Sequence, residues 1–435
     1  MADKIPVISL FSGAMGLDLG LEAAGFEVVL AVECDRQAVE TIRANRPNLH
    51  VIERKIEDVT TEEILETAGL KAGGAFIVSG GPSCQSFSTA GSRRSLGDPR
   101  GGLFRHFVRI VEEAQPKFFL MENVKGMLSA AIMHRPLNQR GPGFPPLLAD
   151  EELGSAFRVI VAELRRLNYY TVFDVLNAAD YGTPQSRERI LFIGSRDGKR
   201  VEMPAPTHAA EPNAELKKWV NLRSAIGTLD ASKAEGTRLV PSHAKFLKLI
   251  PEGGNWRDLP DNLKEEALGG AFHSWGGRSG FYRRLSWDRP SPALPTTPDA
   301  KATMLCHPTD LRPLNIREYA RIQQFPDGWK FAGSLTSQYR QIGNAVPVGL
   351  GTALGGAIKD AWKRHNGKKP LGVVETHNGD LLRRMALRPV TMLNPPSMRK
   401  GASTLNTTEW DVSRGKRRVD AGQYAAAVHA STILG

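Results

Sequence analysis

Short apolar runs recur along the first 200 residues of the chain, separated by stretches with helical periodicity. The runs at 7–10, 28–32, 75–78 and 118–121 are four or five residues long, as expected of buried strands. Apolar residues at 103–114 instead follow helical spacing, which is typical of a helix packed on a core. Strands that alternate with helices in this way predict an α/β protein built on an open sheet.

The first β-α-β unit carries a glycine turn and an acidic residue at informative positions. The turn Phe-Ser-Gly-Ala-Met-Gly at 11–16 follows the first strand, and the second strand ends at Glu33. An acid about 20 residues beyond such a turn can bind the hydroxyls of a ribose, and Phe11 can stack on an adenine. A nucleoside-containing cofactor is therefore expected. A nicotinamide dinucleotide is an alternative, although its turn usually begins Gly-x-Gly.

Two later strand ends carry groups suited to catalysis. The run at 75–78 leads into Gly-Gly-Pro-Ser-Cys-Gln at 80–85, and the run at 118–121 leads into Glu122. Ligands of open α/β sheets bind at the carboxyl ends of the strands, so we expect the thiol of Cys84 and this carboxylate to face one site. The alternatives are a small buried cysteine and a carboxylate that caps a helix or forms an ion pair.

A third candidate group precedes the strand at 190–194. The chain reads Gln-Ser-Arg-Glu-Arg at 185–189. If it is already extended there, Gln185, Arg187 and Arg189 share one face, because strand side chains alternate. Two arginines on one face suit an anion or a polar base edge, with an ion-pair cluster as the alternative.

The patterning loosens between these motifs and the C-terminal part of the chain. We expect a small domain at 195–313, inserted into a catalytic domain formed by 1–194 and 314–365, and an irregular insertion at 130–150. Aromatic residues, glycines and arginines interleave at 273–285, as they do in loops that read DNA grooves. The candidate DNA contacts in this run are Arg283 and Arg284.

Composition narrows the class of partner. The 435 residues carry a formal net charge of +11, which favours a polyanion, and the basic extension at 366–435 contributes to that excess. No run of 18 apolar residues and no signal peptide is visible, so a cytoplasmic protein is expected. The three cysteines, Cys34, Cys84 and Cys306, lack metal-ligand spacing, and we expect reduced thiols and no metal site.

Six ordered motifs between residues 5 and 365 together resemble those of the cytosine-5 DNA methyltransferases. The motifs are the turn at 11–16, the loop at 80–88, Glu-Asn-Val at 122–124, Gln-x-Arg-x-Arg at 185–189, and the segments 317–326 and 338–347. The resemblance implies a Rossmann-like S-adenosylmethionine-dependent catalytic domain with a smaller target-recognition domain. It also implies methyl transfer from S-adenosylmethionine to carbon 5 of a flipped-out cytosine in a specific duplex DNA sequence, through a covalent cysteine adduct.

The same resemblance assigns roles to individual residues. The implied catalytic residues are Cys84, Glu122, Arg187 and Arg189. The implied cofactor contacts are Phe11, Ser12, Gly13, Gly16, Glu33, Cys34, Ile56, Pro82, Leu103, Asn344, Ala345 and Val346. Gln85 and Ser88 are the implied contacts to the DNA backbone near the target.

Two positions depart from the family pattern. Ser83 replaces the second proline of the usual catalytic loop, and Lys55 stands where an aspartate usually contacts the adenine. A catalytically silent DNA-binding relative therefore stays open, as does a transfer-RNA methyltransferase of the same fold, although its Cys-Phe-Thr mark is absent. We expect a monomer of prokaryotic type, because no long region precedes the first motif, and a partner restriction endonuclease is an open possibility.

Overall fold

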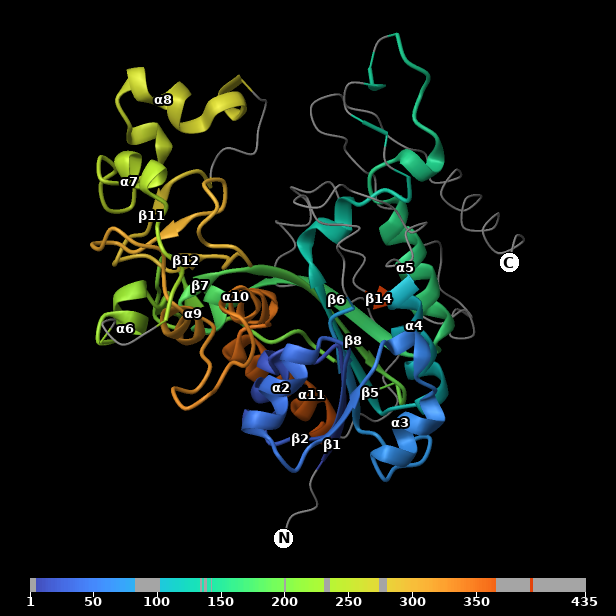
Figure 1. The fold of residues 1–435 in the computed structure, drawn as a ribbon. Helices are drawn as coiled ribbons and strands as arrows, with labels where there is room; N and C mark the ends of the chain where they lie inside the picture. Colours follow the sequence, from blue (N-terminus) through green and yellow to red (C-terminus); the bar gives the residue numbers. More distant parts are fainter. Residues whose placement is uncertain are drawn as a thin grey trace.

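An eight-stranded mixed sheet forms the centre of the molecule (Figure 1). The computed structural model describes residues 5–82, 102–133, 135–136, 139–141, 143–198, 201–230, 235–273, 280–364 and 392–393. The strand order is β14-β6-β8-β5-β4-β1-β2-β3. The parallel strands are β1 (Pro6–Leu10), β2 (Glu27–Glu33), β3 (His50–Glu53), β4 (Ile77–Gly80) and β5 (Phe118–Val124). Their carboxyl ends therefore lie along one edge of the sheet.

The remaining strands complete the other half of the sheet. Strand β8 (Glu188–Ser195) runs antiparallel to both β5 and β6 (Tyr170–Asn177), and β14 (Met392–Leu393) pairs with β6 at the outer edge. Because β8 is antiparallel, its first residues lie beside the last residues of β5, with Arg189 opposite Val124. The predicted Gln-x-Arg-x-Arg segment thus reaches the same edge as the ends of β1, β2, β4 and β5.

Helices cover both faces of the sheet and bury separate cores. One face packs against α1 (Gly16–Ala23), α2 (Arg36–Asn45), α9 (Ile316–Ile322), α10 (Leu335–Asn344) and α11 (Val348–Lys363). The other face packs against α3 (Thr61–Thr67), α4 (Gly102–Ala114) and α5 (Ser155–Arg166). Strand alternation produces this division, since Val7 and Ile77 enter the first core while Ile8 and Val78 enter the second.

The returning helix α11 makes an unusually close contact with α1. A side-chain carbon at Gly20 would lie 2.5 Å from the carbonyl oxygen of Val348 and 2.6 Å from the backbone of Gly351. Only glycine permits this approach of two helix backbones, so the small residues at both positions fix where α11 lies. The segment just before α11 is thereby brought to the turn that begins α1.

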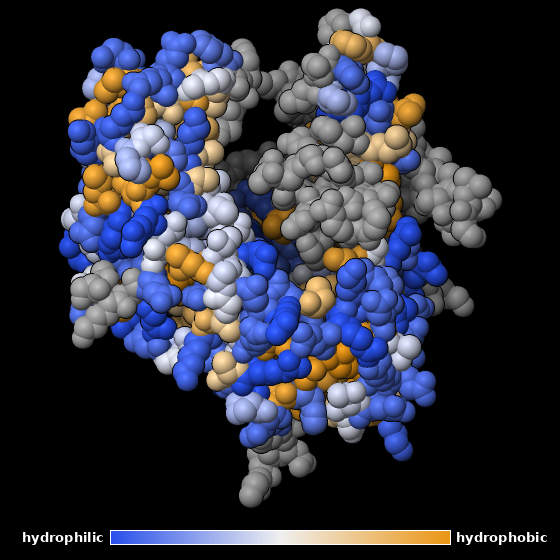
Figure 2. Space-filling model, in the orientation of Figure 1, coloured by the Kyte–Doolittle hydropathy of each residue, from blue (hydrophilic) through white to orange (hydrophobic). Residues whose placement is uncertain are grey.

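The interval between β8 and α9 contains a third, smaller core. The helices of this interval are α6 (Leu222–Ile226), α7 (Pro241–Leu247) and α8 (Asp261–Leu268), and its short strands include β11 (Arg283–Arg284) and β13 (Leu305–Cys306). The third core draws its buried residues from 246–306 and is distinct from the two cores of the sheet. Figure 2 shows the surface hollowed beside this part of the molecule.

Several expected elements are observed, and others differ. The strands at 7–10, 28–32, 75–78 and 118–121 correspond to β1, β2, β4 and β5. The expected helix at 317–326 ends at Ile322, because Gln324 adopts a φ of 64° and Pro326 follows. The expected strand through 185–189 is interrupted at Arg187, between β7 (Gln185–Ser186) and β8. No helix in the described ranges is long and apolar enough to cross a membrane.

Candidate active site

The turn that follows β1 has a strained backbone. Phe11, Gly13 and Met15 have φ values of 55°, 52° and 67°, so every second residue of the turn is left-handed. The hydroxyl of Ser12 donates to the hydroxyl of Ser9 over 2.9 Å. Left-handed conformations cost free energy for residues other than glycine and persist where the surrounding structure enforces them, which is common at ligand sites.

Glu33 connects this turn to the end of β2. Its Oε2 accepts from the backbone N–H of Gly13 over 2.8 Å, and its Oε1 accepts from the N–H groups of Cys34 and Asp35, also over 2.8 Å. A carboxylate has about four acceptor positions, so these three bonds leave capacity for a ribose hydroxyl. The neighbouring thiol of Cys34 is exposed, and partial burial together with the charge of Glu33 raises its pKa.

Residues 344–346 close the other side of the turn. A side-chain carbon at Gly16 would lie 2.3 Å from the carbonyl oxygen of Val346 and 3.1 Å from the Cβ of Ala345. Ala345 and Val346 are buried, whereas Asn344 is exposed. The structure thus brings the first and the last of the predicted cofactor contacts together, although more than 300 positions separate them in the sequence.

Three further predicted cofactor contacts lie along the same edge of the sheet. Ile56 is buried, and its carbonyl accepts a long 3.4 Å bond from Arg109. Pro82 is buried and Leu103 is half-buried, and these two residues flank the segment 83–101. Cys84, Gln85 and Ser88 belong to that segment and lie outside the described residues, as does Ser83.

Glu122 occupies the end of β5, at the entrance to the segment that contains Cys84. Its Oε1 lies 2.8 Å from the Nε of Arg189, and the two side chains are 11% and 14% exposed. A side-chain carbon at Gly81 would lie 2.9 Å from the other carboxylate oxygen, so Glu122 faces the strand end three residues before Cys84. Burial, opposed by the charge of Glu122, lowers the pKa of Arg189.

Arg187 points toward the segment just before α11. Its Nη2 donates to the carbonyl of Gly343 over 2.8 Å and more weakly, over 3.4 Å, to that of Asn344. Its Nε is buried and has no hydrogen-bond partner among the described residues. Burial, the largest cause, and the nearby charge of Arg189 lower the pKa of this guanidinium. Arg187 therefore ties the start of β8 to the 344–346 segment, whereas Arg189 serves Glu122.

Two polar residues of the site carry no role in the sequence prediction. The amide of Gln323 donates to the carbonyls of Ile342 and Ala345 over 2.7 and 3.1 Å and accepts from Gln185 over 3.0 Å. Asn123 donates to the carbonyl of Pro82 over 3.2 Å. Both are buried amide side chains in motif segments. An amide residue among apolar neighbours in a motif is the sequence feature that could have indicated a buried hydrogen-bonding role for them.

Arg284 does not occupy the position expected of a DNA contact. It is 7% exposed, and its guanidinium donates to the carbonyls of Ile250 and Leu247 over 2.8 and 2.9 Å. Longer bonds of 3.3–3.4 Å reach the carbonyls of the turn at 307–310. The structure therefore replaces the predicted DNA contact with a structural role. Its neighbour Arg283 is half-buried, and for Arg283 a contact to DNA stays a prediction.

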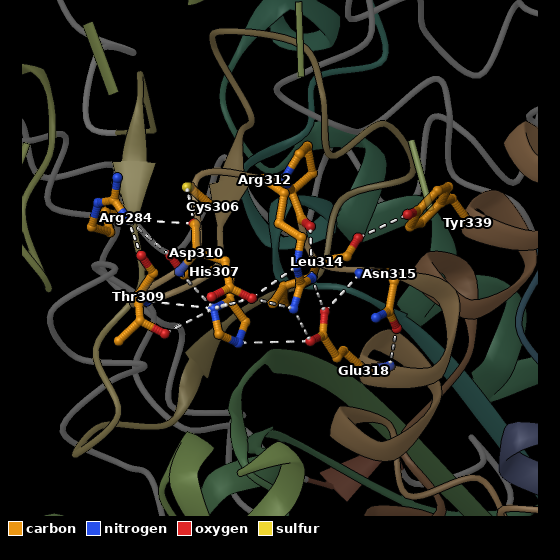
Figure 3. A network of polar contacts seen from close by, with 11 residues as sticks. Arg284, Cys306, His307, Thr309, Asp310, Arg312, Leu314, Asn315, Glu318 and Tyr339 are labelled. Atoms are coloured by element: carbon orange, nitrogen blue, oxygen red, sulfur yellow. Dashed lines mark hydrogen bonds and ion pairs between the residues drawn. The ribbon is translucent and has the colours of Figure 1, made fainter. Parts of the chain in front are cut away.

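The turn at 307–310 is held from its other side by a second arginine–glutamate pair. Arg312 donates to both carboxylate oxygens of Glu318 over 2.9 and 2.8 Å, and Glu318 also accepts from the N–H of Asn315 (Figure 3). Nδ1 of His307 accepts from the N–H of Asp310 over 3.0 Å. Arg284 on one side and Glu318 on the other thus join the small third core to α9.

Comparison with known proteins identifies similar chains. A family model described as C-5 cytosine-specific DNA methylase matches residues 5–140 and 145–360. The Type II methyltransferase M.PspPI of a Psychrobacter species is 40% identical over 81% of this chain and 78% of its own. M.Sau96I of Staphylococcus aureus is 38% identical over 81% of this chain and 75% of its own.

One solved structure has a similar fold. It is a DNA modification methyltransferase encoded within an Escherichia coli prophage, 24% identical, with a TM-score of 0.56 over 83% of this chain and all of that chain. This likeness supports the mixed α/β architecture.

Proposed function

This chain belongs to the C-5 cytosine-specific DNA methylase family, and we propose from that premise that its strand-end clusters are one methyl-donor site and one cytosine site. The enzyme is a DNA cytosine-5 methyltransferase, and its family uses S-adenosylmethionine. The proposed donor site comprises the turn at 11–16, Glu33 and the 344–346 segment. The proposed cytosine site comprises Glu122, Arg189 and Cys84.

The observation that carries this proposal is the Glu122–Arg189 pair at the entrance to the Cys84 segment. Carbon 5 of cytosine is a weak nucleophile until a nucleophile adds at carbon 6. The thiolate of Cys84 forms that bond, and a proton delivered to ring nitrogen 3 lets the electron pair collect at carbon 5. Glu122 is positioned to hold that proton, and Arg189 to donate to the carbonyl oxygen of the base.

The remaining steps restore the enzyme. Bound S-adenosylmethionine supplies an electrophilic methyl group to carbon 5. A base then removes the proton from carbon 5, the electron pair of that C–H bond expels the thiolate of Cys84, and the proton on ring nitrogen 3 returns to Glu122. Both reacting ring atoms are hidden in a duplex, so the cytosine must leave the stack first, and Gln85 and Ser88 are proposed to contact the backbone it leaves.

The nucleophile is tested by Cys84→Ser. We expect no detectable methyl transfer from labelled S-adenosylmethionine, with retained DNA binding, because a hydroxyl is a far weaker nucleophile than a thiolate. DNA with 5-fluorocytosine at the target should trap a covalent complex with the wild-type enzyme, since fluorine cannot leave as a proton. Methyl transfer by Cys84→Ser near the wild-type rate would contradict the assignment.

We also propose that one specific duplex sequence is methylated, with 195–313 as the target-recognition domain. The Type II methyltransferase names of the similar chains support this, as does the separate third core. A monomer that acts beside a partner endonuclease fits the same names. Bisulfite sequencing of plasmid DNA from cells that express the enzyme should reveal a single methylated motif, and scattered methylation would argue against specificity.

A further inference from the structure

A buried polar cluster lies beneath the cofactor turn, and the proposed mechanism does not use it. Ser9 on β1 and Ser79 on β4 are register partners on adjacent parallel strands, so their side chains share one face of the sheet. Asp18, in the first turn of α1, is 1% exposed, and the hydroxyl of Ser9 hydrogen-bonds to its carboxylate. Oδ1 of Asp18 and the hydroxyl of Ser79 are both buried without a partner among the described residues.

The cluster is connected to the cofactor turn by hydroxyl groups. Ser12 lies in that turn and donates to the Oγ of Ser9 over 2.9 Å. The hydroxyl of Ser12 also lies within 3.2 Å of the carbonyl oxygen of Ser9. A hydroxyl donates one hydrogen bond at a time, so the state of Asp18 sets whether the Oγ of Ser9 can accept from Ser12. When the carboxylate is ionised, Ser9 donates to Asp18 and Ser12 donates to Ser9. The lone pairs of Ser12 then face outward, toward the proposed ligand.

We propose that Asp18 is a positioning residue for the methyl donor, which acts through Ser9 and Ser12 and favours S-adenosylmethionine only when its carboxylate is ionised. The proposal rests on the cofactor site proposed above. S-adenosylmethionine carries a sulfonium and an ammonium group, so outward lone pairs at Ser12 and a negative charge below the turn both favour its binding. Uptake of a proton by Asp18 allows the hydroxyl chain to reverse and removes that charge.

The surroundings of Asp18 allow it to titrate near neutral pH. Burial raises its pKa to about 7, the Ser9 hydrogen bond opposes this shift, and the charge of Glu22 adds to it. Glu22 lies one turn along α1 and is paired with Arg46 at 2.7 Å. β1 and β4 present the hydroxyls of Ser9 and Ser79. Lys359 on α11 donates to the carbonyl of Ala24 at the far end of α1.

Calorimetric titration of S-adenosylmethionine, without DNA, tests the proposal at pH values from 5.5 to 8.5. We expect the wild-type dissociation constant to fall by about three- to tenfold as the pH rises through about 7. Asp18→Asn, which keeps the shape but cannot ionise, should have a pH profile without this step. Ser12→Ala, which interrupts the chain, should reduce the step. The cofactor's own ionisation contributes equally to all three proteins.

The outcomes separate the two proposals. Binding by every protein with the same pH profile would overturn the role of Asp18 while leaving the cofactor site intact. Absence of binding in every protein would overturn the cofactor site and the role of Asp18 with it.

Stability provides an independent measurement of the titration. Because the folded pKa lies above the unfolded value of 3.8, wild-type stability should fall as the pH rises from about 4 to about 7. Asp18→Asn should lack that fall, and an identical pH dependence in both proteins would contradict the titration.

Discussion

Two arginine–glutamate pairs with differently buried carboxylates, 11% exposed at Glu122 and 2% exposed at Glu318, serve different purposes in this molecule. At the proposed cytosine site, Glu122 contacts Arg189 through one oxygen, while its other oxygen faces the strand end that leads to Cys84. At the joint to the third core, both oxygens of Glu318 are taken by Arg312, and the N–H of Asn315 adds a third bond. Oε2 of Glu122 has no hydrogen-bond partner among the described residues, which leaves it able to receive a substrate, whereas both oxygens of the 2% exposed Glu318 are held within the protein and stabilise the fold.

The charges of the two arginines reflect the same difference. Burial dominates at Arg189 and lowers its pKa, while the hydrogen bonds of Glu318 dominate at Arg312 and raise its pKa. The first guanidinium donates to Glu122 and, over 2.8 Å, to the carbonyl of Glu188, and its remaining N–H groups are proposed to donate to the carbonyl oxygen of a base. The second has its demand met within the protein.

The largest expected effect is a loss of methyl transfer at the Glu122–Arg189 pair that the Glu318–Arg312 pair does not share. Glu122→Gln should reduce methyl transfer by a factor of about 10² to 10⁴, because the group that holds the ring-nitrogen proton is lost. Single-turnover transfer of labelled methyl groups to DNA measures this. The matched control is Glu318→Gln, assayed at a temperature where it is folded, which should stay within about tenfold of wild type. Equal losses in both variants would erase the distinction between the pairs.

The Glu318–Arg312 pair, which should matter little for methyl transfer, should matter strongly for stability. Glu318→Gln is expected to lower the free energy of unfolding by about 3–5 kcal/mol, because it removes one partner of a buried pair. Asp310→Asn is the control in the same cluster, since Asp310 is 52% exposed and should cost less than about 1 kcal/mol. Urea unfolding followed by fluorescence measures both. If Glu318→Gln lowered the free energy of unfolding by no more than Asp310→Asn does, the buried Glu318–Arg312 pair would not stabilise the fold as proposed.

Adjacent arginines in the third core give a smaller contrast. Arg284→Ala should lower stability by about 1–3 kcal/mol, because several buried carbonyls lose their donor. Arg283→Ala should lower stability less than Arg284→Ala does and should weaken binding of target DNA, by about 1–3 kcal/mol if Arg283 reads a guanine. Urea unfolding and DNA titration at fixed salt test the two changes. If Arg283→Ala kept the DNA affinity and site preference of the wild type, residues other than Arg283 would recognise the DNA sequence.

The smallest expected effect concerns His307 and the pH. Burial is the main cause that lowers its pKa below 6.5, so the unfolded chain binds its proton more readily than the folded one. Stability should therefore decrease as the pH falls through 6.5, because protonation of Nδ1 would remove the acceptor of the Asp310 N–H. His307→Gln should show a weaker decrease in urea midpoint between pH 7.5 and pH 5. If the urea midpoints of His307→Gln and the wild type decreased equally, a group other than His307 would cause the pH dependence.

The sequence predicted those features that depend on local pattern or on ordered motifs. The strands β1, β2, β4 and β5 follow from short apolar runs, and Glu122 and Arg189 follow from motif residues at strand ends. Helix α2 was not predicted, because its apolar positions are few and its mean hydropathy is low. Arg284 was assigned incorrectly because sequence pattern does not reveal which of two neighbouring arginines points into a core.

Other features depend on contacts between distant segments. The hydrogen bond from Arg187 to the carbonyl of Gly343 joins residues 156 positions apart, and only the packing of α11 on α1 brings those segments together. The partnerless atoms of Asp18 and Ser79 are likewise properties of the packed sheet. A pattern of residue types along the chain does not show which buried polar atoms will find a hydrogen-bond partner in the folded protein.

The close contact between α1 and α11 also sets an order of events during synthesis. Residues 11–16 leave the ribosome early, but Ala345 and Val346, which complete the proposed donor site, follow more than 300 residues later. At about 5–20 residues per second, that interval lasts roughly 15–70 s. A nascent chain therefore has no complete donor site until all of the proposed target-recognition region, residues 195–313, has been made. Completion of the proposed donor site therefore depends on synthesis through the segment that precedes α11.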